Sequence, residues 1–289
     1  MYFRSDMAKE IRDRFMKEYS AEHEGEPDGI RYYEERYGRA VVSTVLIYNE
    51  TGARLLSKPA GKYVTVNVGK LWQTDADTFK ECADVISGVI KSMRRGSGAV
   101  LAAGVGNRAV TADALGPLAA SHMIATHHIS GTDVCVKSGL GDLAVVSPGV
   151  LSQTGIEAAK QIKSAAENVK PALIIVVDSL AAAGIETLST SVQITDTGIS
   201  PGSGVGNDRG ELSVRTLGVP VVAVGVPTVV DAAALLPDGC AEDGYKALKG
   251  YYVCPKDSDR SVSELARLIG YAVNRVCHPD LSYDDMAYI

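Results

Sequence analysis

Four short stretches, each apolar along nearly its whole length, constrain the fold of this chain more than any other feature of its sequence. They are AVLAAGVG (99–106), DLAVVSP (142–148), ALIIVVDSL (172–180) and VPVVAVGVP (219–227). A strand that is apolar on both faces is buried on both faces, which is typical of a parallel sheet covered by helices. The four stretches therefore predict the core strands of one mostly parallel sheet.

Segments with helical patterning alternate with these strands and complete the prediction of the fold class. We expect helices over 113–128, 155–169 and 229–236, and an amphipathic helix over 258–277 closes the chain. Strands and helices in alternation give an α/β protein, a three-layer αβα sandwich with right-handed crossovers.

The sequence before the first core strand follows a different pattern. RAVVSTVLIYN (39–49) and KYVTVNV (62–68) alternate as two antiparallel strands do, and they predict an N-terminal β-hairpin. A helix is expected over 75–94. Residues 7–37 are expected to be helical at first and then irregular. We find no repeat and no linker, so we expect a single domain over residues 1–289.

Composition and charge exclude several classes of protein. The net charge of −6 argues against a partner bound through nucleic-acid phosphates. No apolar run approaches the roughly 20 residues that span a bilayer, and the charged N-terminus has no signal-peptide core. The five cysteines are scattered without a CxxC pair, which is typical of a reducing cytoplasm. We expect a cytoplasmic protein without a membrane or nucleic-acid partner.

The stretch GVGNRAVTADALGP (104–117) resembles a phosphate-binding turn but lacks the residues that such a turn needs. The third glycine of a dinucleotide fingerprint is replaced by Ala109, and no GK[ST] sequence is present. Asp113, near the start of the expected helix, would repel a bound anion, whereas the helix dipole favours its own carboxylate. We therefore interpret the stretch as one that places the Asp113 carboxylate in the site, and not as one that binds a phosphate.

Asp178, after the apolar run ALIIVV, is the second aspartate expected at the end of a core strand. Either aspartate alone is well explained as the N-cap of a following helix. Two on different strands of one sheet would converge on one cleft, because sites form beyond the carboxyl ends of parallel strands. Such a pair can divide acid and base roles, which makes Asp113 and Asp178 the candidate catalytic residues.

Five separated motifs, in order, resemble the germination protease family of spore-forming bacteria. They are GVGNRAVTADALGP, VSPGVLSQTGIE, VVDSLAAAGIE, QITDTGISPGSGVGN and LGVPVVAVGVPTVVDA. The resemblance implies a fold akin to hydrogenase-maturation endopeptidases, within the phosphorylase/hydrolase-like group. It also implies an atypical aspartic peptidase whose essential aspartates fall on Asp113 and Asp178.

The same resemblance implies a function and a maturation step. Family members degrade small acid-soluble spore proteins in the germinating spore, so these proteins would be the substrates and the forespore or spore core the compartment. The family acts as homotetramers that are made as zymogens. FRSDMAKE (3–10) resembles the processing site, which implies cleavage between Asp6 and Met7 and loss of residues 1–6 as a short propeptide.

Other polar residues are candidates for lining the cleft. Glu157 is interpreted as charging or capping the first turn of its helix, and Asp196 and Asp231 as caps or loop anchors. The histidines near 122–128 do not share one helix face, and no HExxH motif is present. No cofactor and no metal are expected. The candidates are Asn107, Glu157, Asp196, Asp231 and His128.

Two alternatives remain open at this point. One is a metal-assisted peptidase in which the two carboxylates are hard-oxygen ligands beside His128 or water. The other is a non-catalytic sporulation protein on the same scaffold, which binds a peptide without cutting it.

Overall fold

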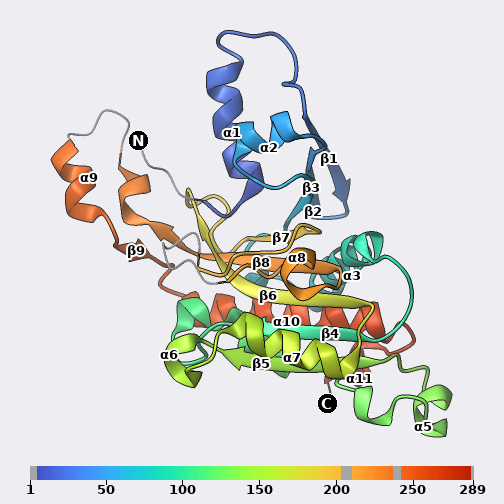
Figure 1. Ribbon diagram of the computed structural model, residues 1–289. Coiled ribbons are helices and arrows are strands. Elements are labelled where there is room, and N and C mark those ends of the chain that lie inside the picture. The colour runs from blue at the N-terminus through green and yellow to red at the C-terminus, as the bar shows by residue number, and fades with distance from the viewer. Residues whose placement is uncertain (1–4, 203–209, 237–241, 288–289) are drawn as a thin grey trace.

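A computed structural model of the chain describes residues 5–202, 210–236 and 242–287. Their strands form one sheet in the order β1-β2-β3-β7-β8-β6-β4-β5, with β9 paired to the end of β8 (Figure 1). The strands are β1 Ile30–Tyr37, β2 Ala40–Ile47, β3 Gly61–Asn67, β4 Val100–Val105, β5 Leu143–Gly149, β6 Leu173–Ala182, β7 Ser191–Thr195, β8 Val221–Asp231 and β9 Tyr252–Val253.

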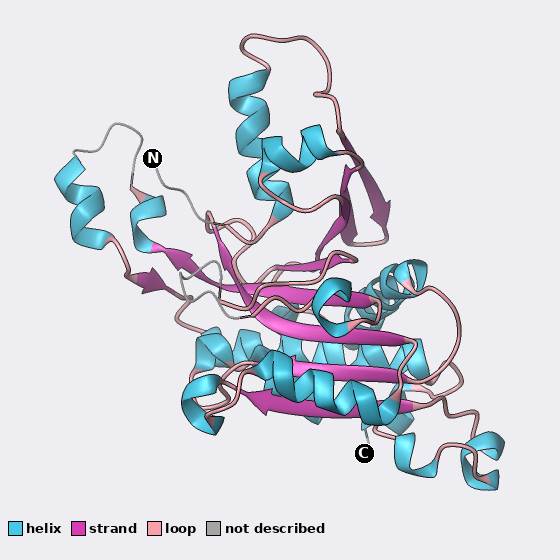
Figure 2. Ribbon diagram, in the orientation of Figure 1, coloured by secondary structure: helices cyan, strands magenta, loops and turns pink. Residues whose placement is uncertain are grey.

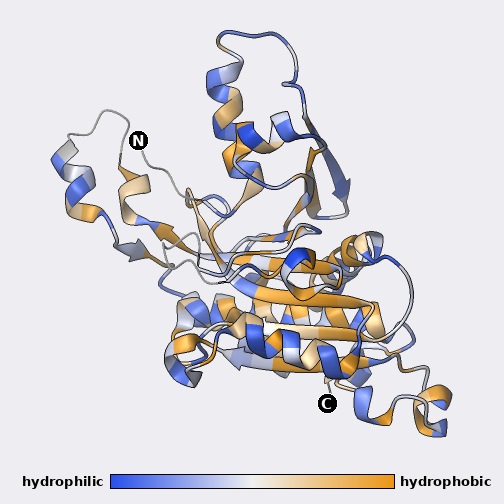
Figure 3. Cartoon of the chain, viewed as in Figure 1, coloured by the Kyte–Doolittle hydropathy of each residue, from blue (hydrophilic) through white to orange (hydrophobic). Residues whose placement is uncertain are grey.

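The four apolar stretches are β4, β5, β6 and β8, and all four are parallel, as predicted. Alternate residues of β6 enter two different cores. Ile175 and Val177 pack toward α3, α4 and α10, whereas Ile174 and Val176 pack toward α7. Helices on both faces of the sheet give the predicted three-layer αβα sandwich (Figure 2), and the buried strands form its apolar centre (Figure 3).

The helices confirm some of the expected boundaries and correct others. The expected helices over 75–94 and 258–277 are α3 and α10. The expected helix over 155–169 is split at Gly155, which lies at φ 69°. Residues 229–231 belong to β8, so the helix expected over 229–236 is reduced to a 3₁₀ helix, Ala232–Leu235. The helices are α1 Ala8–Tyr19, α2 Glu50–Leu56, α3 Ala76–Met93, α4 Leu115–Ser121, α5 Asp133–Lys137, α6 Leu151–Thr154, α7 Ala158–Val169, α8 Val214–Leu217, α9 Glu242–Leu248, α10 Ser258–Cys277 and α11 Tyr283–Ala287.

The antiparallel part of the sheet differs most from the sequence-based expectation. Strands β2 and β3 pair as predicted, but α2 connects them instead of a tight turn. Strand β1 forms where an irregular segment was expected, and β7 was missed. Along β1 only Ile30 is buried, so backbone pairing with β2 holds this edge strand and no apolar alternation marks it.

The helices in the described ranges include none with the length and apolar content needed to cross a bilayer.

Candidate active site

Asp178 lies inside a strand, with ordinary strand on both sides of it. Strand β6 continues to Ala182, and no helix starts at Asp178, so the N-cap interpretation of this residue is wrong. Asp178 is 2% exposed and lies in register with Gly225 of β8. Burying a carboxyl group costs free energy, so packing alone does not account for an aspartate here.

Asp113 ends a short 3₁₀ helix, Thr111–Asp113, directly before α4. Its side chain is half-buried, and its Oδ2 accepts a hydrogen bond of 2.8 Å from the Asn107 backbone N–H. Asn107, a predicted cleft residue, therefore lies beside Asp113 in the turn that follows β4. The helix expected over 113–128 is shorter than predicted, since α4 ends at Ser121.

Two glycines bring α4 into backbone contact with the sheet. A Cβ on Gly116 would lie 2.2 Å from the Val105 oxygen and 2.5 Å from the Val177 oxygen. A Cβ on Gly104 would lie 2.1 Å from the Gly116 oxygen. Val177 directly precedes Asp178, and Gly116 follows Asp113 by three residues. The two aspartates are therefore carried by backbone segments that touch each other.

Strand β8 adds a second anchor for the Asp113 segment. Leu180 pairs with Pro227 and Ala181 with Val229, which leaves Thr228 as the extra residue of a β-bulge. Bulges redirect side chains beside functional sites. Thr228 is 1% exposed. Its hydroxyl donates a 2.6 Å hydrogen bond to the carbonyl of Ala112, the residue before Asp113. Sequence analysis missed Thr228, although a hydroxyl within a buried apolar run was a signal for it.

Two further candidates act as helix-end residues. Asp231 closes β8, and its carboxylate accepts a 2.9 Å bond from the Ala233 N–H as the cap of a 3₁₀ helix. Glu157 occupies the N-cap position of α7, but its side chain makes no capping hydrogen bond. Both lie near helix ends, as the sequence indicated, and Glu157 is positioned to act on its helix through charge.

Asp196 and His128 do not lie with Asp113 and Asp178, which corrects their prediction as cleft residues. Asp196 follows β7, which is antiparallel to β8, so it lies at the amino end of β8. Its Oδ1 accepts a 2.8 Å bond from the Lys62 N–H. His128 is exposed and follows Thr126, whose N–H donates to the oxygen of Leu143, the first residue of β5. Both residues therefore lie at the amino edge of the parallel strands.

The position of His128 bears on the metal alternative. The ligand set of Asp113, Asp178 and His128 is not assembled, because the histidine lies at the opposite edge of the sheet. Within residues 5–202, 210–236 and 242–287, no three His, Cys, Asp or Glu side chains form a group that could hold a metal ion.

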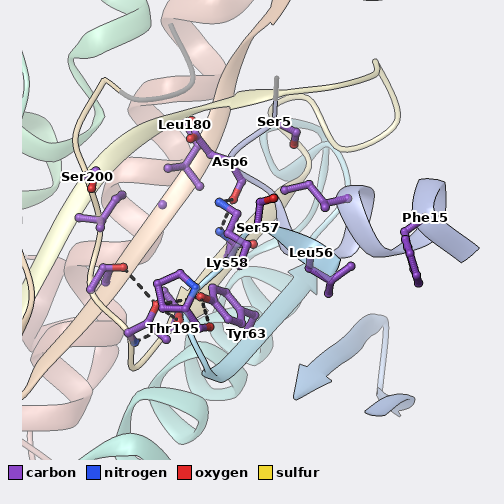
Figure 4. A pocket seen from close by; sticks show the side chains of 18 of the residues that line it. Ser5, Asp6, Phe15, Leu56, Ser57, Lys58, Tyr63, Leu180, Thr195 and Ser200 are labelled. Atoms are coloured by element: carbon purple, nitrogen blue, oxygen red, sulfur yellow. Dashed lines mark hydrogen bonds between the residues drawn. The ribbon is translucent and has the colours of Figure 1, made fainter. Parts of the chain in front are cut away.

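A groove with a volume of about 1140 Å³ runs beside this site, between the N-terminal segment and the sheet (Figure 4). Its walls come from α1, α2, Tyr63 of β3, β7 and the loop after β7. Leu180 of β6 and Gly225 of β8 also line it, and Gly225 is the in-register neighbour of Asp178. The groove therefore extends to the pair of strands that carries this aspartate.

The fold defines the class of protein: an α/β protein in which helices cover both faces of one sheet. The particular family follows from comparison with known sequences. A model of the germination protease family matches residues 6–241, well over half of the 289-residue chain. The chain belongs to the germination protease family and is a peptidase.

Individual relatives agree with the family match. The chain is 39% identical to a germination protease of Caldanaerobacter subterraneus, over 81% of this chain and 71% of the relative. It is 32% identical to the germination protease of Clostridium tetani, over 99% and 98% of the two chains. Among solved structures, a NiFe hydrogenase maturation protease from Thermococcus kodakarensis aligns with a TM-score of 0.36 and 18% identity. That alignment covers 64% of this chain and 98% of the other.

Proposed function

We propose that the protein is an endopeptidase that starts the degradation of small acid-soluble spore proteins during germination, with Asp113 and Asp178 acting on one water molecule. The observation that carries this proposal is the contact of Gly116 with the oxygens of Val105 and Val177, which joins the two aspartate-bearing segments. Membership of the germination protease family supports the peptidase activity and the spore as its setting.

The proposed chemistry divides two roles between the carboxyl groups. Asp113 takes the proton of the attacking water, since the Asn107 N–H stabilises negative charge on its Oδ2. Asp178, in its protonated form, donates its proton to the carbonyl oxygen as water adds. When the tetrahedral intermediate collapses, Asp113 passes the proton it took from water to the leaving amine, and Asp178 recovers its proton from the hydroxyl group that becomes a carbonyl or carboxyl oxygen again. The groove supplies the space for an extended substrate segment beside them.

We also propose that the protein is made as a zymogen that cuts itself between Asp6 and Met7 and works as a homotetramer in the spore core. In this structure Met7 is fully buried and the Asp6 N–H is bonded to the Ala181 oxygen at 2.9 Å. Cleavage therefore requires residues 5–7 to leave their site. Intact-mass measurement at mildly acidic pH tests the cleavage, and light scattering tests the tetramer.

A digest of purified small acid-soluble spore proteins tests the proposed activity most simply. Mass spectrometry should find a few discrete fragments, and EDTA or phenanthroline should leave the digestion rate unchanged. Inactivation by chelators that added metal reverses would assign the same carboxylates to a metal-assisted peptidase. Binding without fragments would identify a peptide-binding protein instead.

A further inference from the structure

The N-terminal residues Ser5–Met7 are here called the strap. Ser5 and Asp6 line the groove (Figure 4), and the backbone bends at Asp6. The strap pairs with the end of β6 at two points. The Asp6 N–H donates to the Ala181 oxygen at 2.9 Å, and the Ala181 N–H donates to Asp6 Oδ2 at 2.9 Å. The Met7 residue is 0% exposed. The strap is therefore held as a bound peptide would be, through its backbone, one acidic side chain and one apolar side chain.

Gln193 of β7 holds the backbone on both sides of Met7. Its Nε2 donates to the Asp6 carbonyl at 3.0 Å, and its Oε1 accepts from the Ala8 N–H at 2.6 Å. A side-chain amide carries the same donor and acceptor as a peptide group. Gln193 thus bonds to the backbone on either side of Met7 as a neighbouring strand would. These bonds do not depend on which side chains the strap carries.

Lys58 provides a second donor to the same carbonyl oxygen. Its Nζ lies 3.1 Å from the Asp6 oxygen, which also accepts from the Gln193 amide. Ser57, in the left-handed region at φ 49°, and Pro59 fix the backbone on either side of Lys58. Burial lowers the pKa of Lys58, and the nearby Asp6 carboxylate opposes that shift. Removing the carbonyl would leave this partly buried amino group without that acceptor, which is costly.

We propose that Lys58, Gln193 and Ala181 form a docking site for a peptide segment, filled here by the strap and taken by a substrate segment when the strap leaves. The identity of that occupant rests on the proposed function. The strap defines its chemistry, namely an acidic residue followed by an apolar residue, with the backbone bent at the acidic residue. Ala181 lies three residues beyond Asp178 on β6, about 10 Å along the strand, so a docked segment lies next to the candidate catalytic strand.

Binding of an acetylated, amidated peptide with the sequence of residues 3–8 tests this site in the full chain. The Asp113→Asn background prevents cleavage, and Met7→Asp unseats the strap, since a charged side chain does not fit the closed Met7 site. Fluorescence anisotropy should show that the peptide binds this variant more tightly than the chain with its strap in place. Adding Lys58→Met or Gln193→Leu should weaken binding about tenfold or more. Lys62→Met, the same change outside the groove, should not alter it.

A kinetic measurement covers the case in which Met7→Asp fails to fold. In the otherwise native chain, Lys58→Met should raise KM for a spore-protein substrate about tenfold with kcat nearly unchanged, as expected when uniform binding is lost. The docking site would be overturned if the Lys58 and Gln193 variants bound the peptide as tightly as the variant they were added to, or if KM were unchanged. Absence of cleavage by the native chain would instead overturn the proposed function, and the anisotropy measurement would still report on the docking site.

Discussion

The parallel half of the sheet, formed by β4, β5, β6 and β8, holds its candidate functional groups differently from the antiparallel half, formed by β1, β2, β3 and β7. In the parallel half, Asp113 and Asp178 are fixed by backbone contact, through Gly116 on the oxygens of Val105 and Val177. In the antiparallel half and its flanks, Lys58 and Gln193 reach the strap with long side chains. The first arrangement suits chemistry, which needs fixed geometry, and the second suits a ligand that arrives and leaves.

This contrast has an energetic side. The odd-numbered and even-numbered residues of β6 are both buried, so changes in the parallel half meet a packed core on either face. Strand β1 is exposed along most of its length. Substitutions in the parallel half should therefore reduce stability and activity together, whereas those in the groove wall should change substrate binding alone.

Gly116→Ala should give the largest combined effect on stability and activity. The new Cβ would lie 2.2 Å and 2.5 Å from two backbone oxygens, so α4 must move away from β4 and β6. We expect a loss of about 1–3 kcal/mol in the free energy of unfolding and a loss of activity of about 100-fold, measured by urea denaturation and by digestion rate.

Gly88→Ala is the matched control for that variant. Gly88 lies inside α3, and a Cβ there meets nothing within 4 Å. This change should stabilise the protein by about 0.5–1 kcal/mol without affecting activity. Equal behaviour of the two variants would remove the distinction between the halves.

Thr228→Val should have a smaller effect of the same kind. Valine fills nearly the same volume but leaves the Ala112 carbonyl without its 2.6 Å donor. We expect a loss of about 1 kcal/mol in stability, together with slower digestion because the Asp113 segment is less firmly held. Thr228→Ser keeps the hydroxyl and should retain most of the stability and most of the digestion rate. If valine and serine behave alike, the bulge does not position Asp113.

Acid should weaken the parallel half through His278, the residue that follows α10. The residue is 0% exposed. Its Nδ1 accepts from the Gly141 N–H at 3.1 Å, and its Nε2 donates to the Ile124 oxygen at 2.9 Å. Burial lowers the pKa of His278. Its contribution to stability is present above pH of about 6.5 and is lost as pH falls through the folded-state pKa. Urea denaturation from pH 7 to 5 should show this slope, and His278→Gln should remove it.

Acid should have the opposite and smaller effect on the strap, through Glu10 of α1. Its carboxyl group accepts from Ser5, from the Ala183 N–H at 2.6 Å and from Thr187. Burial raises the pKa of Glu10, and nearby Glu186 adds to the shift. Stability from Glu10 is therefore present below pH of about 4.3 and is lost as pH rises through the folded-state pKa.

The matched variant for that effect is Glu10→Gln. The difference in unfolding free energy between the native chain and this variant should become less favourable to the native chain as pH rises from 4 to 7. A difference that stays constant with pH would show that the carboxyl group does not titrate in this range.

The sequence predicted the parallel half because its strands are apolar on both faces. It singled out Asp113 and Asp178 as candidates from expected places at strand ends, but β6 continues past Asp178 to Ala182. It failed for His128, which is close to Asp113 in sequence. The crossover through α4 carries the chain back to the amino edge of the sheet, where β5 begins.

The docking residues were beyond prediction for a different reason. Gln193 contacts the strap across 187 residues of sequence, in its bond to Asp6, and β7 has no pattern that distinguishes it. The role of Lys58 depends on where α2 ends relative to the strap. Such long-range contacts follow from the assembled fold and leave no local signal.

The central claim, that Asp113 and Asp178 act as one unit, is tested most directly by comparing Asp113→Asn, Asp178→Asn and the double variant in the same digestion assay. Each single change should lower kcat/KM by about 10²–10⁴-fold while the thermal unfolding curve still shows a folded protein. The kcat/KM of the double variant should lie within a few-fold of that of the less active single variant, because each residue contributes only as part of the pair. Losses that multiply in the double variant, or a single variant that keeps most of its activity, would contradict the account.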